Sequence, residues 1–176
     1  MARGLRLALL AAGLALVADC ARPSPSVNLP EGAYVLDGEA GLGLLSQCSR
    51  ATPAKGEATF HPDAADIVRL EAELPQAIVD RAHIPPGGDW PHLDPAIAKS
   101  FAQAPKGWWR QYVGLVRQGR RFVYGNFVPA ARGVAEDPAA LAKSPEVVCD
   151  GGPAFFGAEY DPAAGRFTHL AFNGPG

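Results

Sequence analysis

The clearest alternation of apolar and polar positions lies near the C-terminus of the chain. From Ala154 to Tyr160, apolar side chains recur at every second residue, which is the period of a strand that buries one face. The segment 161–165 places proline and glycine at turn positions, so that 166–172 can return as the second strand of a hairpin. In that returning strand Phe167 falls on the opposite face from Leu170, which predicts either a bulged strand or one buried on both faces.

A second hairpin is predicted around Gly119. The flanking segments 111–116 and 121–128 are rich in β-branched and aromatic residues, and Gly119 fits the second central position of a two-residue turn. In this register Leu115 faces Phe122, Val113 faces Tyr124 and Tyr112 faces Gly125. An aromatic ring that covers a glycine across the strand pair helps to hold the register.

The period changes to three or four residues in the middle of the chain, where the apolar positions are Ala64, Ile67, Leu70, Leu74 and Ile78. This spacing predicts the main helix, with one apolar face toward the core. Pro62 and Asp63 are typical of a helix start, and Pro75 predicts either a kink or an end followed by a new start. Glu71 and Glu73 lie off the apolar stripe, where we expect them to face solvent.

With a short first strand at 33–36, these elements predict an α+β fold: one main helix packed on an antiparallel sheet of about four or five strands. The 176 residues, 48% of them hydrophobic, suit a single domain over residues 31–176. The 20 glycines and 17 prolines indicate many turns. The net charge of −2, with scattered Lys and Arg, gives no basic face, and we expect no nucleic-acid partner.

The first twenty residues have the pattern of an export signal. Arg3 and Arg6 precede a short uncharged apolar run, which is too short for a spanning helix. The run ends at 17–20, Val-Ala-Asp-Cys, which resembles the lipobox of bacterial lipoproteins, with Asp19 in place of the usual small residue. The resemblance implies a signal peptide over residues 1–19 and a lipidated Cys20 that carries palmitate.

The same resemblance implies an anchor in the outer membrane, with the domain facing the periplasm. Residues 20–30 are rich in proline and serine and are expected to form an extended tether. The alternative is cleavage after Ala18, which would release a soluble periplasmic or secreted protein.

Export determines how the two remaining cysteines are interpreted. Cys48 and Cys149 form an even pair in an oxidising compartment, which predicts a disulfide. The spacing of Leu44, Leu45 and Cys48 suits a short helix that presents Cys48 to the core. Arg50 and Asp150 each lie within two residues of a half-cystine, and we expect the bridge to bring them together.

The candidate binding residues are aromatic: Trp90, Trp108 and Trp109, with Arg110 beside them. Flat rings next to a cation suit a glycan or an anionic ligand, whereas core packing is the alternative role for the rings. The polar loop residues His83, Asp89, His92 and Asp94 lack the spacing of a metal site. We expect no metal and no cofactor.

The chain carries no G-x-S-x-G or H-E-x-x-H motif. Glu159 or Asp161 could act with His169 across the C-terminal hairpin as acid and base of a small peptidoglycan or peptide hydrolase. The runs 46–50, 149–152 and 155–161 are similar to uncharacterised exported envelope proteins of bacteria, a resemblance that implies no activity. We therefore expect a non-enzymatic binding or inhibitory module for an envelope protein or glycan, then a hydrolase, then a structural envelope protein.

Overall fold

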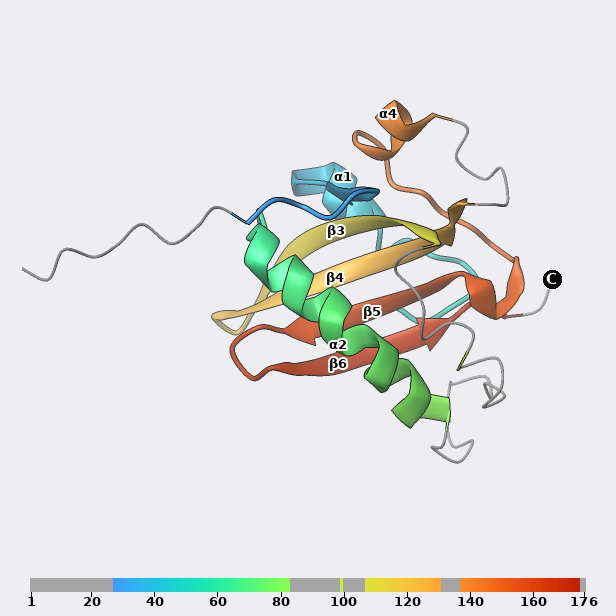
Figure 1. Ribbon diagram of the computed structural model, residues 1–176. Coiled ribbons are helices and arrows are strands. Elements are labelled where there is room, and N and C mark those ends of the chain that lie inside the picture. The colour runs from blue at the N-terminus through green and yellow to red at the C-terminus, as the bar shows by residue number, and fades with distance from the viewer. Residues whose placement is uncertain (1–26, 83–98, 100–106, 131–136, 175–176) are drawn as a thin grey trace, which may run out of the picture.

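The computed structural model describes residues 27–82, 99, 107–130 and 137–174. Its strands form one sheet, and the long helix α2 crosses one face of that sheet (Figure 1). In chain order the elements are β1 (Ala33–Val35), α1 (Gly38–Gly43), β2 (Ala58–Phe60), α2 (Ala64–Ala82), β3 (Trp108–Arg117), β4 (Arg120–Pro129), α4 (Pro138–Leu141), the 3-10 helix η2 (Gly152–Ala154), β5 (Phe156–Asp161) and β6 (Arg166–Phe172).

The described sheet has six strands in the order β1-β3-β4-β5-β6, with β2 also paired to β3. The α+β class and the single main helix are confirmed. The predicted count of four or five strands is too low, and the sheet is mixed because β1 runs parallel to β3. The short first strand predicted at 33–36 is β1. The strand that was not counted is β2, which has only three residues, too few for a period of two to be recognised.

The predicted register of the β3–β4 hairpin is confirmed. Leu115 pairs with Phe122, and Tyr112 pairs with Gly125. The turn uses positive φ at Gln118 and Gly119, as a two-residue turn requires. A Cβ on Gly125 would lie 2.7 Å from the Tyr112 ring, so glycine is needed for the ring to lie flat across the strand pair.

A β-bulge in β6 explains the unusual position of Phe167. Glu159 pairs with His169, but the next residue of β5, Tyr160, pairs with Phe167. Thr168 is therefore the extra residue, and it moves Phe167 to the face of the sheet that carries Tyr160. Of the two alternatives for this strand, the bulge is the one observed.

Helix α2 packs its predicted apolar stripe against that same face of the sheet. Ile67, Leu70, Leu74 and Ile78 are all fully buried, and α2 continues through Pro75 as one helix. Opposite them lie the aromatic residues of the sheet, where Phe127 stacks on Phe156 with 4.5 Å between ring centroids. Full burial of each such side chain contributes roughly 1.5–3 kcal/mol, so this layer supplies most of the apolar core.

The other face of the sheet has a smaller apolar cluster and a network of amide groups. Gln111, Asn126 and Asn173 donate hydrogen bonds from their side-chain amides to backbone carbonyls within 141–150. The buried Arg50 donates to the side-chain oxygens of Asn126 and Asn173. These hydrogen bonds therefore hold two loops against this face of the sheet: the segment 141–150 and the loop that contains Arg50.

The predicted disulfide joins these two loops. Cys48 and Cys149 are bonded, with 4.9 Å between their Cα atoms. One expectation near the bridge is wrong, because Cys48 is exposed and lies after α1, which ends at Gly43. Arg50 and Asp150 do come together, but through Asn173: its side-chain oxygen accepts from Arg50, and its side-chain nitrogen donates to the backbone carbonyl of Asp150.

Candidate functional site

Three of the four candidate binding residues line one recess. Trp108, Trp109 and Arg110 begin β3, and with Glu71 of α2, Ala130 and the segment 30–32 they enclose about 450 Å³. We call this hollow the tryptophan recess. Trp90 lies outside the described residues.

The two indole rings of the recess do not form one stacking surface, because successive residues of a strand point to opposite faces. Trp108 donates from Nε1 to the carbonyl oxygen of Ala154 at 2.7 Å, and its ring meets Phe156 edge-on. Trp109 lies on the other side of the strand, with 6.2 Å between its ring centroid and that of Tyr34. Both rings are half-buried, so each contributes only part of its surface to the recess.

Arg110 connects three other residues of the recess through hydrogen bonds from its guanidinium. Its side chain is only 6% exposed, and its Nε donates to Glu71 Oε1 at 3.0 Å. The two terminal nitrogens donate to the backbone carbonyls of Trp108 and Glu31, each at 2.8 Å. Because Glu71 balances its charge, Arg110 is a poor anchor for the anionic ligand that we expected it to attract.

Glu71 is a part of the site that sequence reasoning missed. It was expected to face solvent, but its side chain is only 11% exposed and accepts hydrogen bonds from Arg110 and from Tyr112 Oη at 2.7 Å. Burial, with the nearby negative charge of Glu71, raises the pKa of Tyr112 well above its usual value. The sequence did carry one signal that Glu71 could be buried: it directly follows Leu70 and so lies at the border of the apolar stripe of the helix.

The residues of the predicted acid–base pair lie on one face of the C-terminal hairpin. Glu159 is directly opposite His169, but both of its oxygens accept from Arg117, at 2.5 and 2.7 Å, and one also accepts from Thr168. The Nε2 of His169 lies 3.0 Å from the carbonyl oxygen of Ala51. A substrate would have to displace Arg117 before Glu159 could accept a proton from it.

Asp161, the other predicted acid, is also committed to contacts within the chain. It is 1% exposed, forms an ion pair with Arg120, and accepts from the backbone amides of Ala163 and Ala164. Its carboxylate therefore organises the β5–β6 turn.

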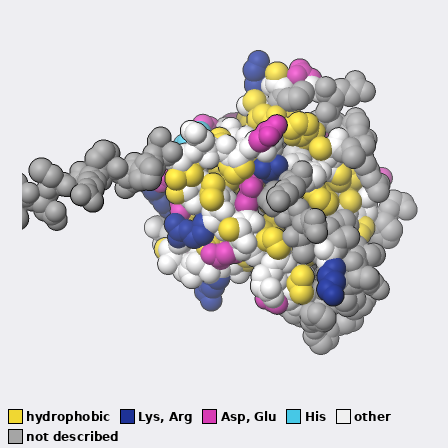
Figure 2. All heavy atoms as spheres, viewed as in Figure 1, with side chains coloured by type: hydrophobic (Ala, Val, Ile, Leu, Met, Phe, Trp, Pro, Cys, Tyr) yellow, Lys and Arg dark blue, Asp and Glu magenta, His cyan; other side chains and the backbone are white. Residues whose placement is uncertain are grey.

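Within the described part of the chain, no group of three or more histidine, cysteine, aspartate or glutamate side chains could hold a metal ion. The polar loop residues between His83 and Asp94 lie outside that part. No described helix is both long and apolar enough to cross a membrane. On the face that α2 covers, acidic and basic side chains are interspersed among apolar ones (Figure 2).

The chain matches no protein-family model, no curated protein and no solved structure. We therefore base the functional proposal on the residues and geometry described above.

Proposed function

We propose that this chain is an exported, lipid-anchored binding module of the bacterial envelope, and that its ligand enters the tryptophan recess. The observation that carries the proposal is the convergence of Trp108, Trp109 and Arg110, chosen as binding residues from their types, on one hollow of about 450 Å³. That volume lies within the roughly 300–1,000 Å³ of small-molecule sites.

The chemistry of the recess favours a neutral sugar ring of an envelope glycan. Indole rings offer apolar surface to the C–H groups of a sugar. Two acidic residues, Glu31 and Glu71, line the recess, and carboxylates are acceptors for hydroxyl groups. An anionic ligand would meet these two carboxylates, while the charge of Arg110 is already balanced.

The leader and the cysteines support export. The lipobox-like segment ends at Cys20, and the disulfide between Cys48 and Cys149 suits an oxidising compartment. The tether 20–30 ends at the recess, because Pro30 is one of its walls. Ten residues of extended chain reach at most about 36 Å, so a lipid on Cys20 would hold the recess close to the membrane surface.

Isothermal titration of the soluble Cys20→Ser form with neutral N-acetylglucosamine oligosaccharides tests the ligand. We expect binding that Trp109→Ala abolishes and that Trp109→Phe retains in part. Val147→Ala removes an exposed apolar side chain outside the recess and should leave the affinity unchanged. No binding of these sugars, or equal binding by the Trp109→Ala variant, would refute the glycan site.

A small hydrolase is the second candidate, and the facing pair of Glu159 and His169 supports it. Incubation of the protein with isolated peptidoglycan, followed by chromatography of the released fragments, tests this activity. Fragment release that is lost in the Glu159→Gln variant would favour the hydrolase. If the unsubstituted protein releases no fragments but binds the sugars, the binding module is favoured.

A further inference from the structure

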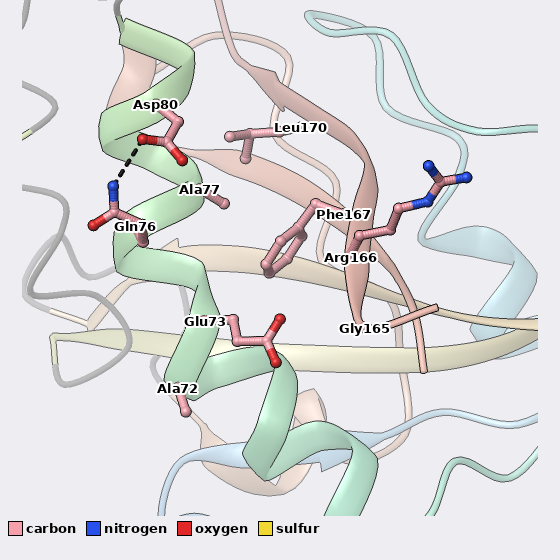
Figure 3. A pocket seen from close by; sticks show the side chains of 9 residues that line it. All are labelled: Ala72, Glu73, Gln76, Ala77, Asp80, Gly165, Arg166, Phe167 and Leu170. Atoms are coloured by element: carbon pink, nitrogen blue, oxygen red, sulfur yellow. Dashed lines mark hydrogen bonds between the residues drawn. The ribbon is translucent and has the colours of Figure 1, made fainter. Parts of the chain in front are cut away.

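A second hollow lies between α2 and the edge strand β6, and it encloses about 540 Å³. Glu73, Gln76, Ala77 and Asp80 line its α2 side, and Phe167 and Leu170 lie opposite them (Figure 3). We call it the α2–β6 hollow. None of these residues lines the tryptophan recess.

The β6 side of the hollow is apolar. Leu170 is 1% exposed, and the ring of Phe167 is half-buried beside Tyr160, with 5.2 Å between their centroids. The bulge at Thr168 is what places Phe167 on this side of the sheet. The hollow therefore has an aromatic surface only because β6 carries one extra residue.

The α2 side of the hollow is acidic. Glu73 and Asp80 are seven residues apart, which places both on one side of a helix. Glu73 Oε1 accepts from Tyr160 Oη at 2.9 Å, and Asp80 Oδ1 accepts from Gln76 Nε2 at 2.7 Å. Each carboxylate keeps a second oxygen that bonds no described residue. Figure 3 shows Glu73 extending from α2 toward Phe167, whereas Asp80, which also lines the hollow, turns one oxygen toward Gln76.

The basic residue at the rim does not neutralise these acids. Arg166 begins β6, and its guanidinium points away from α2 (Figure 3). The hollow thus combines two carboxylates with an apolar, partly aromatic surface, and it has room for more than a single ion. Among the described residues no three side chains are grouped as a metal site requires, so a metal ion fits this chemistry poorly.

We propose that the α2–β6 hollow binds an organic cation of the size of a lysine or arginine side chain. The charged group lies between Glu73 and Asp80, and the apolar stem lies along Phe167 and Leu170. A cation close to the Phe167 ring gains further attraction from the ring electrons. The ligand is either a free alkyl diamine or a basic side chain of a partner peptide, since both carry the same group.

Nuclear magnetic resonance titration of the Cys20→Ser form distinguishes the two sources. The probes are Nα-acetyl-lysine methylamide, 1,5-diaminopentane and the neutral Nα-acetyl-norleucine methylamide. We expect the lysine derivative to shift the methyl signals of Leu170 and the ring signals of Phe167, whereas the norleucine derivative leaves them unchanged. Tighter binding of the diamine indicates a free amine, and tighter binding of the lysine derivative indicates a partner peptide.

Substitutions of the two acids test the charge. Glu73→Gln keeps an acceptor for Tyr160 and should weaken the binding of the lysine derivative by roughly tenfold. Asp80→Asn alters an exposed side chain and should also weaken binding, which keeps the test valid if Glu73→Gln fails to fold. Glu39→Gln removes one negative charge from an exposed position of α1 and should have no effect.

Three results would overturn the proposal. The first is equal binding of the lysine and norleucine derivatives, which would mean that charge plays no part. The second is an equal loss of affinity in Glu39→Gln and Asp80→Asn, which would mean that the site responds only to overall charge. The third is the absence of any shift in the Leu170 and Phe167 signals at saturating probe.

Discussion

Removal of the Cys48–Cys149 disulfide should lower the free energy of unfolding by about 4–5 kcal/mol. The two half-cystines are 101 residues apart in sequence, and in the chain-entropy model a closed loop of this length restricts the unfolded chain by about that amount. Both cysteines are exposed, so a reductant reaches the bridge without prior unfolding.

The effect should fall mainly on the unfolded state. In the folded chain, the hydrogen bonds of Gln111, Asn126 and Asn173 still hold the segment 141–150 after reduction. Arg50 continues to connect the loop after Cys48 to the sheet. The reduced chain should therefore fold to the same structure but unfold to a more expanded ensemble, and the urea m-value should rise.

Urea denaturation of the Cys20→Ser form, followed by tryptophan fluorescence, measures both quantities. The oxidised protein is compared with the reduced protein and with the Cys48→Ser/Cys149→Ser variant, for which the reductant should change nothing. The expected loss corresponds to a fall in Tm of roughly 10–20 °C. A difference below about 1 kcal/mol between oxidised and reduced protein would refute the loop argument.

Glu71→Ala leaves Arg110 and the Tyr112 hydroxyl buried without their carboxylate, so urea denaturation should show a loss of about 3–5 kcal/mol. Glu71→Gln keeps a hydrogen-bond acceptor and should lose less free energy of unfolding than Glu71→Ala. Equal losses in the two variants would contradict the role of the ion pair. Burial and the hydrogen bond to Glu73 raise the pKa of Tyr160 to about 12. Since the folded pKa lies above the unfolded value, the Tyr160 contribution to stability is complete below about pH 10 and falls as the pH rises toward 12. Urea midpoints over this range should fall less in Tyr160→Phe, and parallel curves would contradict the shift.

Several features of the fold follow from short-range patterns. The apolar stripe of α2 recurs at the helical period, and the β3–β4 register follows from a glycine turn between two apolar segments. The position of Phe167 in its strand predicted either a bulge or a strand buried on both faces, and the structure shows the bulge. In each case neighbouring residues carry the pattern, because side-chain direction in a helix or strand depends on local backbone geometry.

Other features depend on partners that are distant in sequence. Strand β2 is too short to show a period and is defined by its pairing with β3. The short strand β1 was expected, but its parallel pairing with β3 was not. The polarity of Glu71 suggested solvent, but the chain brings Arg110 and Tyr112 against it. Likewise, Arg50 was expected near Asp150 because each lies close to a half-cystine, whereas its side chain bonds Asn126 of β4 and Asn173, which follows β6.

The residue types along the chain were sufficient for the main helix, both hairpins and the disulfide. The binding role of Trp108, Trp109 and Arg110 stays a prediction. The two hollows were decided only by packing. The tryptophan recess needs the segment 30–32 beside β3, and the α2–β6 hollow needs Phe167 opposite Glu73. Periodicity assigns each side chain to a face of its own element, but which other element covers that face is determined when the whole apolar surface is buried together.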